Sequence, residues 1–206
     1  AVQAEFDRKD VFIALGGGVI GDMTGFAAAT YMRGIRFIQI PTTLLAQVDS
    51  SIGGKTGVDF RSYKNMVGAF HMPSLVYSNV ATLQSLDGTQ YASGMGEVIK
   101  HALIKDPAYF RFLRDHQEEI KARDSAALME TVYQSNLIKR AVVEVDPTEQ
   151  GERQLLNFGH TLGHAIEKCS NFSYSHGQCV AFGCLSAIAI SGTLQAAEVD
   201  DIEQLM

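Results

Sequence analysis

The length and composition of the chain are those of a folded protein with a sizeable core. It has 206 residues, enough for one large domain or two small ones, and 46% of them are hydrophobic, which excludes a disordered chain. The 17 basic and 23 acidic residues give a net charge of −6, which argues against a surface that binds nucleic acid or membranes. Any anionic ligand must therefore be held by cations that gather locally.

The sequence also bears on location. The longest apolar stretch, residues 180–194, is interrupted by glycines and is shorter than the roughly 20 residues that cross a bilayer. The charged first residues lack the apolar core of a signal peptide, and the three cysteines show no paired-thiol spacing, which favours the reducing cytoplasm. Because the chain begins with Ala and reaches a glycine motif almost at once, we expect a fragment of a longer protein.

Residues 1–88 have the pattern of an α/β fold. Short apolar runs predict strands over residues 10–15, 36–40 and 75–77. The first run, DVFIAL, is stopped by glycines and is typical of a fully buried parallel strand. We expect a helix over residues 22–32 with the acidic Asp22 at its positive end, and a loop or hairpin that carries function over residues 47–69.

From residue 89 onward the pattern is helical. Apolar residues at helical spacing predict helices over residues 90–104, 108–121, 125–144, 155–168 and 177–197. Asp124 is placed to cap one of these helices, and Pro107 stands where another would begin. The chain is therefore predicted to hold an α/β domain over residues 1–88 and an all-helical domain over residues 89–206.

A glycine-rich turn follows the first predicted strand. Gly16, Gly18 and Gly21 in ALGGGVIGD match the G-x-G-x-x-G fingerprint of dinucleotide-binding sites. Such glycines let backbone amides approach a pyrophosphate at the start of a helix. The acidic residue that usually follows about 20 positions later is absent from residues 36–43, and a tight structural turn is the alternative interpretation.

A second polar stretch, QVDSSIGGKTGVDFRSYKNMVG, places lysines beside glycines. It contains Asp49, Lys55, Lys64 and Asn65. An ammonium group is a compact charge and flexible backbone can close around an anion, so this stretch predicts a phosphate-binding loop. An exposed polar loop is the alternative.

Histidines and one glutamate suggest a metal site in the helical half. His160 and His164 stand at i and i+4 and share a helix face, a spacing that suits one metal ion or one anion. Thr161 occupies the position of a zincin's glutamate base, which disfavours peptide hydrolysis. His176 could fold back as a third ligand, with Glu97 as the carboxylate. The residues alone leave open whether His164 or His176 completes the site.

Further charged residues accompany these ligands. Glu97 and Lys100 share a helix face among apolar residues, where charge is costly, although a surface ion pair is the alternative. Arg153 has the planar guanidinium that suits a carboxylate, and it lies near Asn157 in the sequence. Lys139 is a further candidate cation.

Together these segments resemble the 3-dehydroquinate synthases, the cyclases of the shikimate pathway and members of the sugar-phosphate cyclase superfamily. The resemblance covers about residues 15–177 and rests on ALGGGVIGDMTGFAAATYMRG, IPTTLLAQVDSSIGGKTGVD, KNMVGAFHMP, GMGEVIKHALI, RQLLNFGHTLGHAIE and SHG. It implies a Rossmann-like NAD-binding α/β part followed by an all-α metal-binding domain, with the active site between them. Family members are longer, so the resemblance also implies a fragment.

The resemblance implies a role for each matching position. The divalent metal, usually zinc with cobalt also possible, would be bound by Glu97, His160 and His176, while His164 would face the substrate. NAD would be bound by Gly17, Gly18, Val19, Asp22, Thr42 and Thr43. The substrate would be surrounded by Asp49, Lys55, Lys64, Asn65, Lys100, Lys139, Arg153 and Asn157, of which Asp49, Lys55 and Lys64 also adjoin the cofactor. Arg33 would reach the substrate phosphate of the neighbouring subunit in a homodimer.

The implied activity is that of a carbon–oxygen lyase that converts 3-deoxy-D-arabino-heptulosonate 7-phosphate to 3-dehydroquinate and phosphate. NAD transiently oxidises the substrate, phosphate is eliminated, the hydride returns and an aldol step closes the ring. The alternatives are a sister cyclase that acts on sedoheptulose 7-phosphate or glucose 6-phosphate, a metal-dependent polyol dehydrogenase, and a non-catalytic fragment. Arg153 with Lys139 disfavours the sister cyclase because its substrate lacks a carboxylate.

Overall fold

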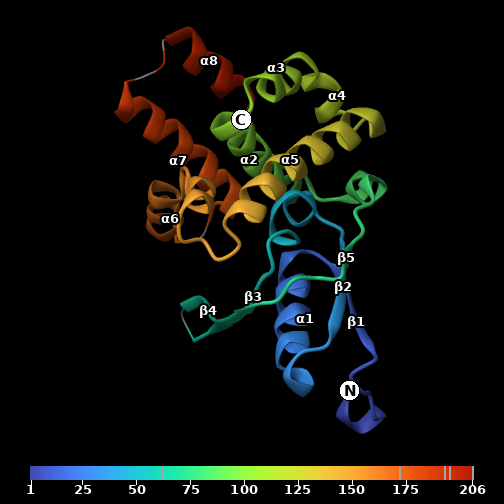
Figure 1. Ribbon diagram of the computed structural model, residues 1–206. Coiled ribbons are helices and arrows are strands. Elements are labelled where there is room, and N and C mark those ends of the chain that lie inside the picture. The colour runs from blue at the N-terminus through green and yellow to red at the C-terminus, as the bar shows by residue number, and fades with distance from the viewer. Residues whose placement is uncertain (62, 172, 193, 195, 206) are drawn as a thin grey trace.

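The chain has an α/β part near its N-terminus and a helical part stacked on one end of it (Figure 1). The computed structural model describes residues 1–61, 63–171, 173–192, 194 and 196–205, and the side chains of residues 63, 64, 196 and 197 lie outside the description. The predicted fold class is confirmed. None of the helices over the described residues is both long and apolar enough to cross a bilayer.

A small parallel sheet with one covering helix forms the α/β part. Its elements are β1 (Val11–Gly16), α1 (Gly18–Thr30), β2 (Arg36–Pro41) and β5 (Leu75–Val76). The strands lie in the order β1-β2-β5, all parallel, with Val11 opposite Arg36 and Ile38 opposite Leu75. Ala28 of α1 and Phe37 of β2 are buried in one apolar cluster. All three predicted strands are present.

Two expectations for this part are wrong in detail. β1 is not fully buried: Ala14 is 3% exposed, whereas Ile13 and Leu15 on the opposite face are 60% and 63% exposed. Successive side chains of a strand alternate between faces, so only one face of β1 is covered. α1 begins at Gly18, with Gly17 as its N-cap, so Asp22 lies in the second turn instead of at the helix start.

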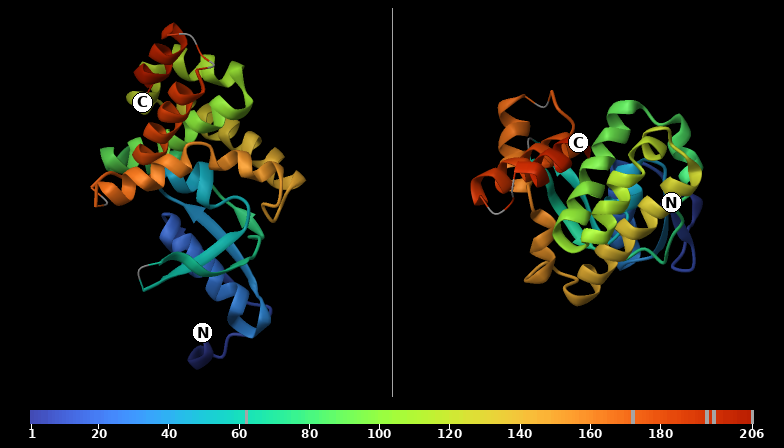
Figure 2. Two further views of the ribbon diagram at one scale, coloured as in Figure 1. Left: turned by 90° about the vertical axis from the view of Figure 1, so that its left-hand side faces the viewer. Right: turned by 90° about the horizontal axis from the view of Figure 1, so that it is seen from above.

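The polar stretch after β2 forms a short helical turn and a hairpin. A π-helical turn covers Ala46–Ser50, and β3 (Lys55–Phe60) pairs with β4 (Tyr63–Phe70) in an antiparallel hairpin. The hairpin lies alongside α1 and projects to one side of the α/β part (Figure 2). The predicted loop or hairpin is confirmed.

The remaining elements are helices. They are α2 (Gly88–Lys105), α3 (Pro107–Asp115), α4 (Gln117–Lys121), α5 (Ser125–Val145), α6 (His160–Cys169), α7 (His176–Ser191) and α8 (Ala196–Leu205), with short 3-10 helices at Val2–Ala4, Tyr31–Arg33, Val80–Ser85 and Glu152–Asn157. The Asp124 carboxylate caps α5 by accepting from the N–H groups of Ala126 and Ala127, and Pro107 opens α3, as predicted.

Three of the predicted helices are interrupted. The helix expected over residues 108–121 divides at His116, and the one over residues 177–197 ends at Gly192, whose φ is 59°. The helix expected over residues 155–168 is broken at Gly159, whose φ of 78° no right-handed helix allows. The 3-10 helix that carries Arg153 is therefore separate from α6, which starts at His160 itself.

Candidate metal centre and anion-binding cavity

Glu97 and His176 meet because α2 and α7 pack closely. Gly96 on α2 lies against Gly177 on α7: a β-carbon on Gly96 would lie 2.2 Å from the Gly177 carbonyl oxygen. The Gly177 N–H also donates to the Ser93 hydroxyl across 3.1 Å. The first turn of α7, which carries His176, is thereby held against the middle of α2.

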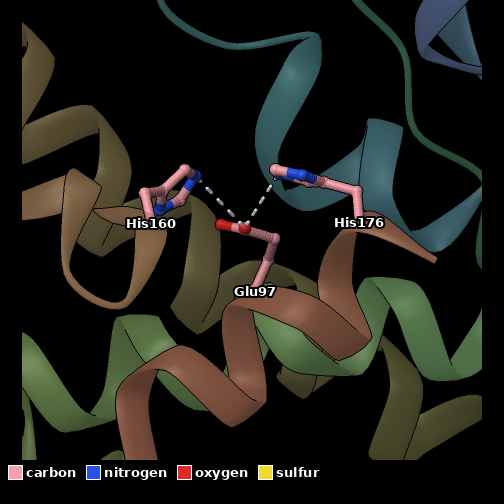
Figure 3. Close-up of side chains that lie close together, drawn as sticks. All are labelled: Glu97, His160 and His176. Atoms are coloured by element: carbon pink, nitrogen blue, oxygen red, sulfur yellow. Dashed lines mark ion pairs between the residues drawn. The ribbon is translucent and has the colours of Figure 1, made fainter. Parts of the chain in front are cut away.

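The carboxylate of Glu97 faces two imidazoles (Figure 3). Its Oε1 lies 3.9 Å from Nε2 of His160 and 3.8 Å from Nε2 of His176. Glu97 is 1% exposed, and this Oε1 has no hydrogen-bond partner among the described residues. A buried carboxylate oxygen without a donor is costly, so the position calls for a cation.

The donor set fits a divalent transition metal. The ligand atoms of Glu97, His160 and His176 all lie within 4.8 Å of one another, close enough for one ion to contact all three, and nitrogen and carboxylate oxygen are common zinc ligands. Burial, and then the positive charge of Lys100, lower the pKa of His160 to about 4, so this imidazole is neutral and free to ligate. Lys100, itself buried, donates to the other oxygen of Glu97 and fixes the carboxylate.

A second group of possible ligands adjoins the first. His164, Glu167 and His176 also offer ligand atoms within 4.8 Å of one another. In this group Nδ1 of His164 lies 3.3 Å from Oε2 of Glu167, within hydrogen-bond range, so the carboxylate is already engaged. The orphaned Glu97 oxygen favours the group of Glu97, His160 and His176, and thus His176 over His164, the choice that the spacing left open.

A cavity of about 450 Å³ opens beside His160, between the hairpin, the π-helical turn and the helices. Its lining includes nine of the residues singled out in the sequence: Asp22, Asp49, Lys55, Asn65, Lys100, Lys139, Arg153, Asn157 and His160. Hairpin and helical residues far apart in the sequence are thus brought to one place. His164 is not in this lining, although its ring lies 5.4 Å, between centroids, from the ring of His160.

Opposite charges are paired among the residues that line the cavity. Nζ of Lys139 donates to the backbone oxygen of Asp49 across 2.7 Å and also to its carboxylate. Burial alone would raise the pKa of Asp49, but the Lys139 and Lys100 ammonium groups hold it well below its usual range. Burial, and then the negative charge of Asp49, raise the pKa of Asp22 to about 6.

Arg153 is buried at the cavity wall and is held by backbone oxygens. Its guanidinium donates to the carbonyl of Pro147 across 2.6 Å and to that of Gly53 across 3.0 Å. It is 2% exposed and lies over the ring of Phe70, 5.9 Å from the centroid. Because these contacts use two of the five N–H donors of an arginine, others remain for a ligand.

Glu149 lines the same cavity and was missed from the sequence. It forms an ion pair with Lys55, and its Oε1 accepts a hydrogen bond from the Asn157 side chain across 3.1 Å. The Asp146 carboxylate accepts from the N–H groups of Gln150 and Gly151 and shapes the loop that carries Glu149. No periodic pattern marks such a loop residue, so only the folded chain reveals it.

The glycine turn and the residues after β2 lie together. Gly17 caps α1, and a β-carbon on it would lie 3.1 Å from Thr43 Cγ2, while the Thr42 N–H donates to the Gly16 carbonyl across 3.0 Å. Val19 is 73% exposed beside them. A helix N-terminus with a glycine cap fits a dinucleotide pyrophosphate.

Two other expected site residues are not placed at the cavity by the described structure. The side chain of Lys64 lies outside the described residues. Arg33 is exposed, with φ at 67°, and does not line the cavity of its own chain.

Comparison with family models places the whole chain in one family. Residues 1–93 match the model described as 3-dehydroquinate synthase N-terminal, and residues 94–206 match the model described as 3-dehydroquinate synthase C-terminal. The second match alone covers more than half of the chain.

Curated relatives give the same result. The chain is 53% identical over 205 residues to 3-dehydroquinate synthase from Syntrophotalea carbinolica, covering 98% of the chain and 57% of the relative. It is also 53% identical over 190 residues to the same enzyme from Symbiobacterium thermophilum, covering 92% of the chain and 53% of the relative. The chain therefore spans just over half the length of these relatives.

Solved structures share the fold. The chain is similar to 2-epi-5-epi-valiolone synthase from Streptomyces hygroscopicus subsp. jinggangensis, solved with NAD⁺ and Zn²⁺ bound, at a TM-score of 0.91 and 30% identity, over 100% of this chain and 58% of that one. It is also similar to 2-deoxy-scyllo-inosose synthase complexed with carbaglucose-6-phosphate, NAD⁺ and Co²⁺, at a TM-score of 0.83 and 29% identity, over 100% and 57%. Because two family models match the chain and two relatives are 53% identical to it, the chain belongs to the 3-dehydroquinate synthase family.

Proposed function

We propose that this chain forms the metal- and substrate-binding core of a 3-dehydroquinate synthase, which converts 3-deoxy-D-arabino-heptulosonate 7-phosphate to 3-dehydroquinate and phosphate. The observation that carries the proposal is the orphaned Oε1 of Glu97, which faces two imidazoles beside a cavity lined by lysines and an arginine. A cation next to an anion-binding cavity suits a substrate that carries both hydroxyl groups and negative charge.

Two sets of residues are assigned to the metal ion and to NAD. Glu97, His160 and His176 would hold a divalent ion, with zinc preferred over cobalt, and Gly17, Gly18, Val19, Asp22, Thr42 and Thr43 would hold NAD. When bound, the ion supplies a Lewis acid for a substrate hydroxyl and NAD supplies a reversible hydride acceptor. Similar proteins solved with NAD⁺ and Zn²⁺ or Co²⁺ support this assignment.

The residues of the chain bind and orient the substrate. Lys55, Asn65 and Asn157 line the cavity and would hold the phosphate together with His164. Arg153 and Lys139 would hold the carboxylate. Because Arg153 is already fixed by two carbonyl oxygens, it can bind the carboxylate without being reordered. Lys100 keeps Glu97 oriented while the substrate is bound.

The protein is further proposed to be cytoplasmic and homodimeric. The three cysteines show no paired-thiol spacing in the sequence, which supports a reducing compartment. In the dimer, Arg33 would extend from its exposed position toward the neighbouring subunit's substrate.

The proposal is tested with the complete natural polypeptide, catalytic NAD⁺, Zn²⁺ and the heptulosonate phosphate. Stoichiometric phosphate release without net NADH is the expected result, and the His160→Ala variant should release none. Net NADH formation would favour a polyol dehydrogenase. Activity on sedoheptulose 7-phosphate or glucose 6-phosphate alone would favour a sister cyclase, and no turnover with any substrate would leave only a non-catalytic role.

A further inference from the structure

We propose that Glu167 is a positioning residue that sets the tautomer and orientation of His164. The inference rests on the proposed function, in which His164 faces the substrate. Both residues belong to α6 and stand at i and i+3, so they share one face of that helix. Nδ1 of His164 lies 3.3 Å from Oε2 of Glu167.

The chemistry of the pair dictates where the proton lies. An ionised carboxylate can only accept hydrogen bonds, so Nδ1 of His164 must carry the proton that it donates to Glu167. Nε2 of a neutral His164 is then left with its lone pair. The carboxylate thus selects a single tautomer of His164 and makes Nε2 the nitrogen available to a ligand.

Burial makes Glu167 the fixed member of the pair. Glu167 is 6% exposed, whereas the side chain of His164 is 59% exposed. The His164 ring lies 5.4 Å from the ring of His160 and 5.7 Å from that of His176, measured between centroids. An accessible imidazole is therefore held beside the candidate metal ligands by a carboxylate that is itself anchored in the protein.

The same contact separates the two overlapping ligand groups. His164, Glu167 and His176 could bind an ion themselves, and His176 belongs to both groups. While Nδ1 of His164 donates to Glu167, neither that nitrogen nor the engaged carboxylate oxygen is free to ligate. Glu167 is thereby engaged with His164, while the Oε1 of Glu97 that faces His176 has no donor among the described residues.

A double-mutant cycle on phosphate release tests the proposal in the complete natural polypeptide loaded with Zn²⁺ and NAD⁺. We expect Glu167→Ala to lower kcat about 10–100-fold, because removing a carboxylate that orients a histidine typically has an effect of this size. The change in KM should be smaller. In a His164→Ala background the Glu167 substitution should have no further effect, because Glu167 acts through His164. A further loss in that background would show a merely structural role and overturn the proposal. Lys168→Ala, an exposed change on the same helix, is the matched control.

A second measurement does not depend on activity. Nitrogen-15 NMR of labelled histidines in the Zn²⁺-loaded protein, at about pH 9 where imidazoles are neutral, should show His164 protonated at Nδ1. In Glu167→Ala the proton should move toward Nε2, and an unchanged tautomer would refute the inference. Glu167→Gln, which fills the same volume, replaces the alanine variant if that one fails to fold, with a smaller but measurable shift expected. If the natural protein shows no cyclase turnover, the proposed function fails while this spectrum still decides the role of Glu167.

Discussion

Replacing Asp22 by asparagine should stabilise the protein in a pH-dependent way. Asp22 is partly buried at the cavity, where burial and the nearby negative charge of Asp49 raise its pKa from 3.8 to about 6. A shift of about 2 units corresponds to about 3 kcal/mol, since each unit is about 1.4 kcal/mol. Because solvent reaches part of the carboxylate and screens it, we expect about 1–2 kcal/mol.

The sign follows from the raised pKa. Between pH 3.8 and about 6 the folded protein binds more protons at Asp22 than the unfolded chain, so the contribution of Asp22 is most favourable below pH 3.8 and is lost as the pH rises through about 6. Asparagine has no such titration. The free energy of unfolding of Asp22→Asn, relative to the natural protein, should therefore rise by about 1–2 kcal/mol between about pH 4 and pH 7.

Urea unfolding at a series of pH values measures this difference directly. Asp115→Asn, which removes an exposed carboxylate paired with Arg114, is the surface control and should differ less from the natural protein. If the advantage of Asp22→Asn is constant across the series, or shrinks as the pH rises, the electrostatic reasoning about the cavity is wrong.

Three further predictions concern the site. Zn²⁺ at about 100 times its Kd should raise the free energy of unfolding by about 3 kcal/mol, and His160→Ala or a chelator should abolish the gain; an equal gain in the variant would exclude the proposed ligands. Gly96→Ala should lower the free energy of unfolding, measured with urea, by about 1–3 kcal/mol, because its β-carbon would meet the Gly177 carbonyl. It should also weaken Zn²⁺ binding in calorimetry, and an unchanged metal affinity would contradict this packing. Glu149→Gln should bind inorganic phosphate about 2–5-fold more tightly in calorimetry because Lys55 is released from its ion pair, and weaker binding would disprove that competition.

Much of the fold follows from local sequence patterns. Apolar runs locate β1, β2 and β5, and helical spacing locates α2 and α5 to within two residues at each end. Local patterns do not show which face of a strand a neighbouring element will bury. β1 looks like a buried strand in sequence, yet Ile13 and Leu15 are exposed because α1 covers only its other face.

Site residues that are near one another in the sequence could be predicted to lie together, whereas contacts made by the packing of separate helices could not. His160 and His164 share a helix by their spacing, but only the approach of α7 to α2 at Gly96 shows that His176 reaches Glu97. Glu167 stands three residues after His164, so helix spacing could have indicated the pair. Glu149 had no comparable signal because it lies in an irregular loop.

Among the described residues of the site, three lysine–carboxylate pairs differ in how readily an anionic ligand can reach them. Lys100 and Glu97 are each 1% exposed, and Lys139 is 7% exposed beside Asp49, so separating either pair would leave a buried charge without a partner. Lys55 is 50% exposed and its partner Glu149 is 21% exposed, so water can compensate both charges when they separate. An incoming phosphate should therefore exchange with Glu149 at Lys55 while the buried pairs keep Glu97 and Asp49 in place. In this way a chain with a net charge of −6 can present the Lys55 ammonium group to an anion while its buried lysines stay paired.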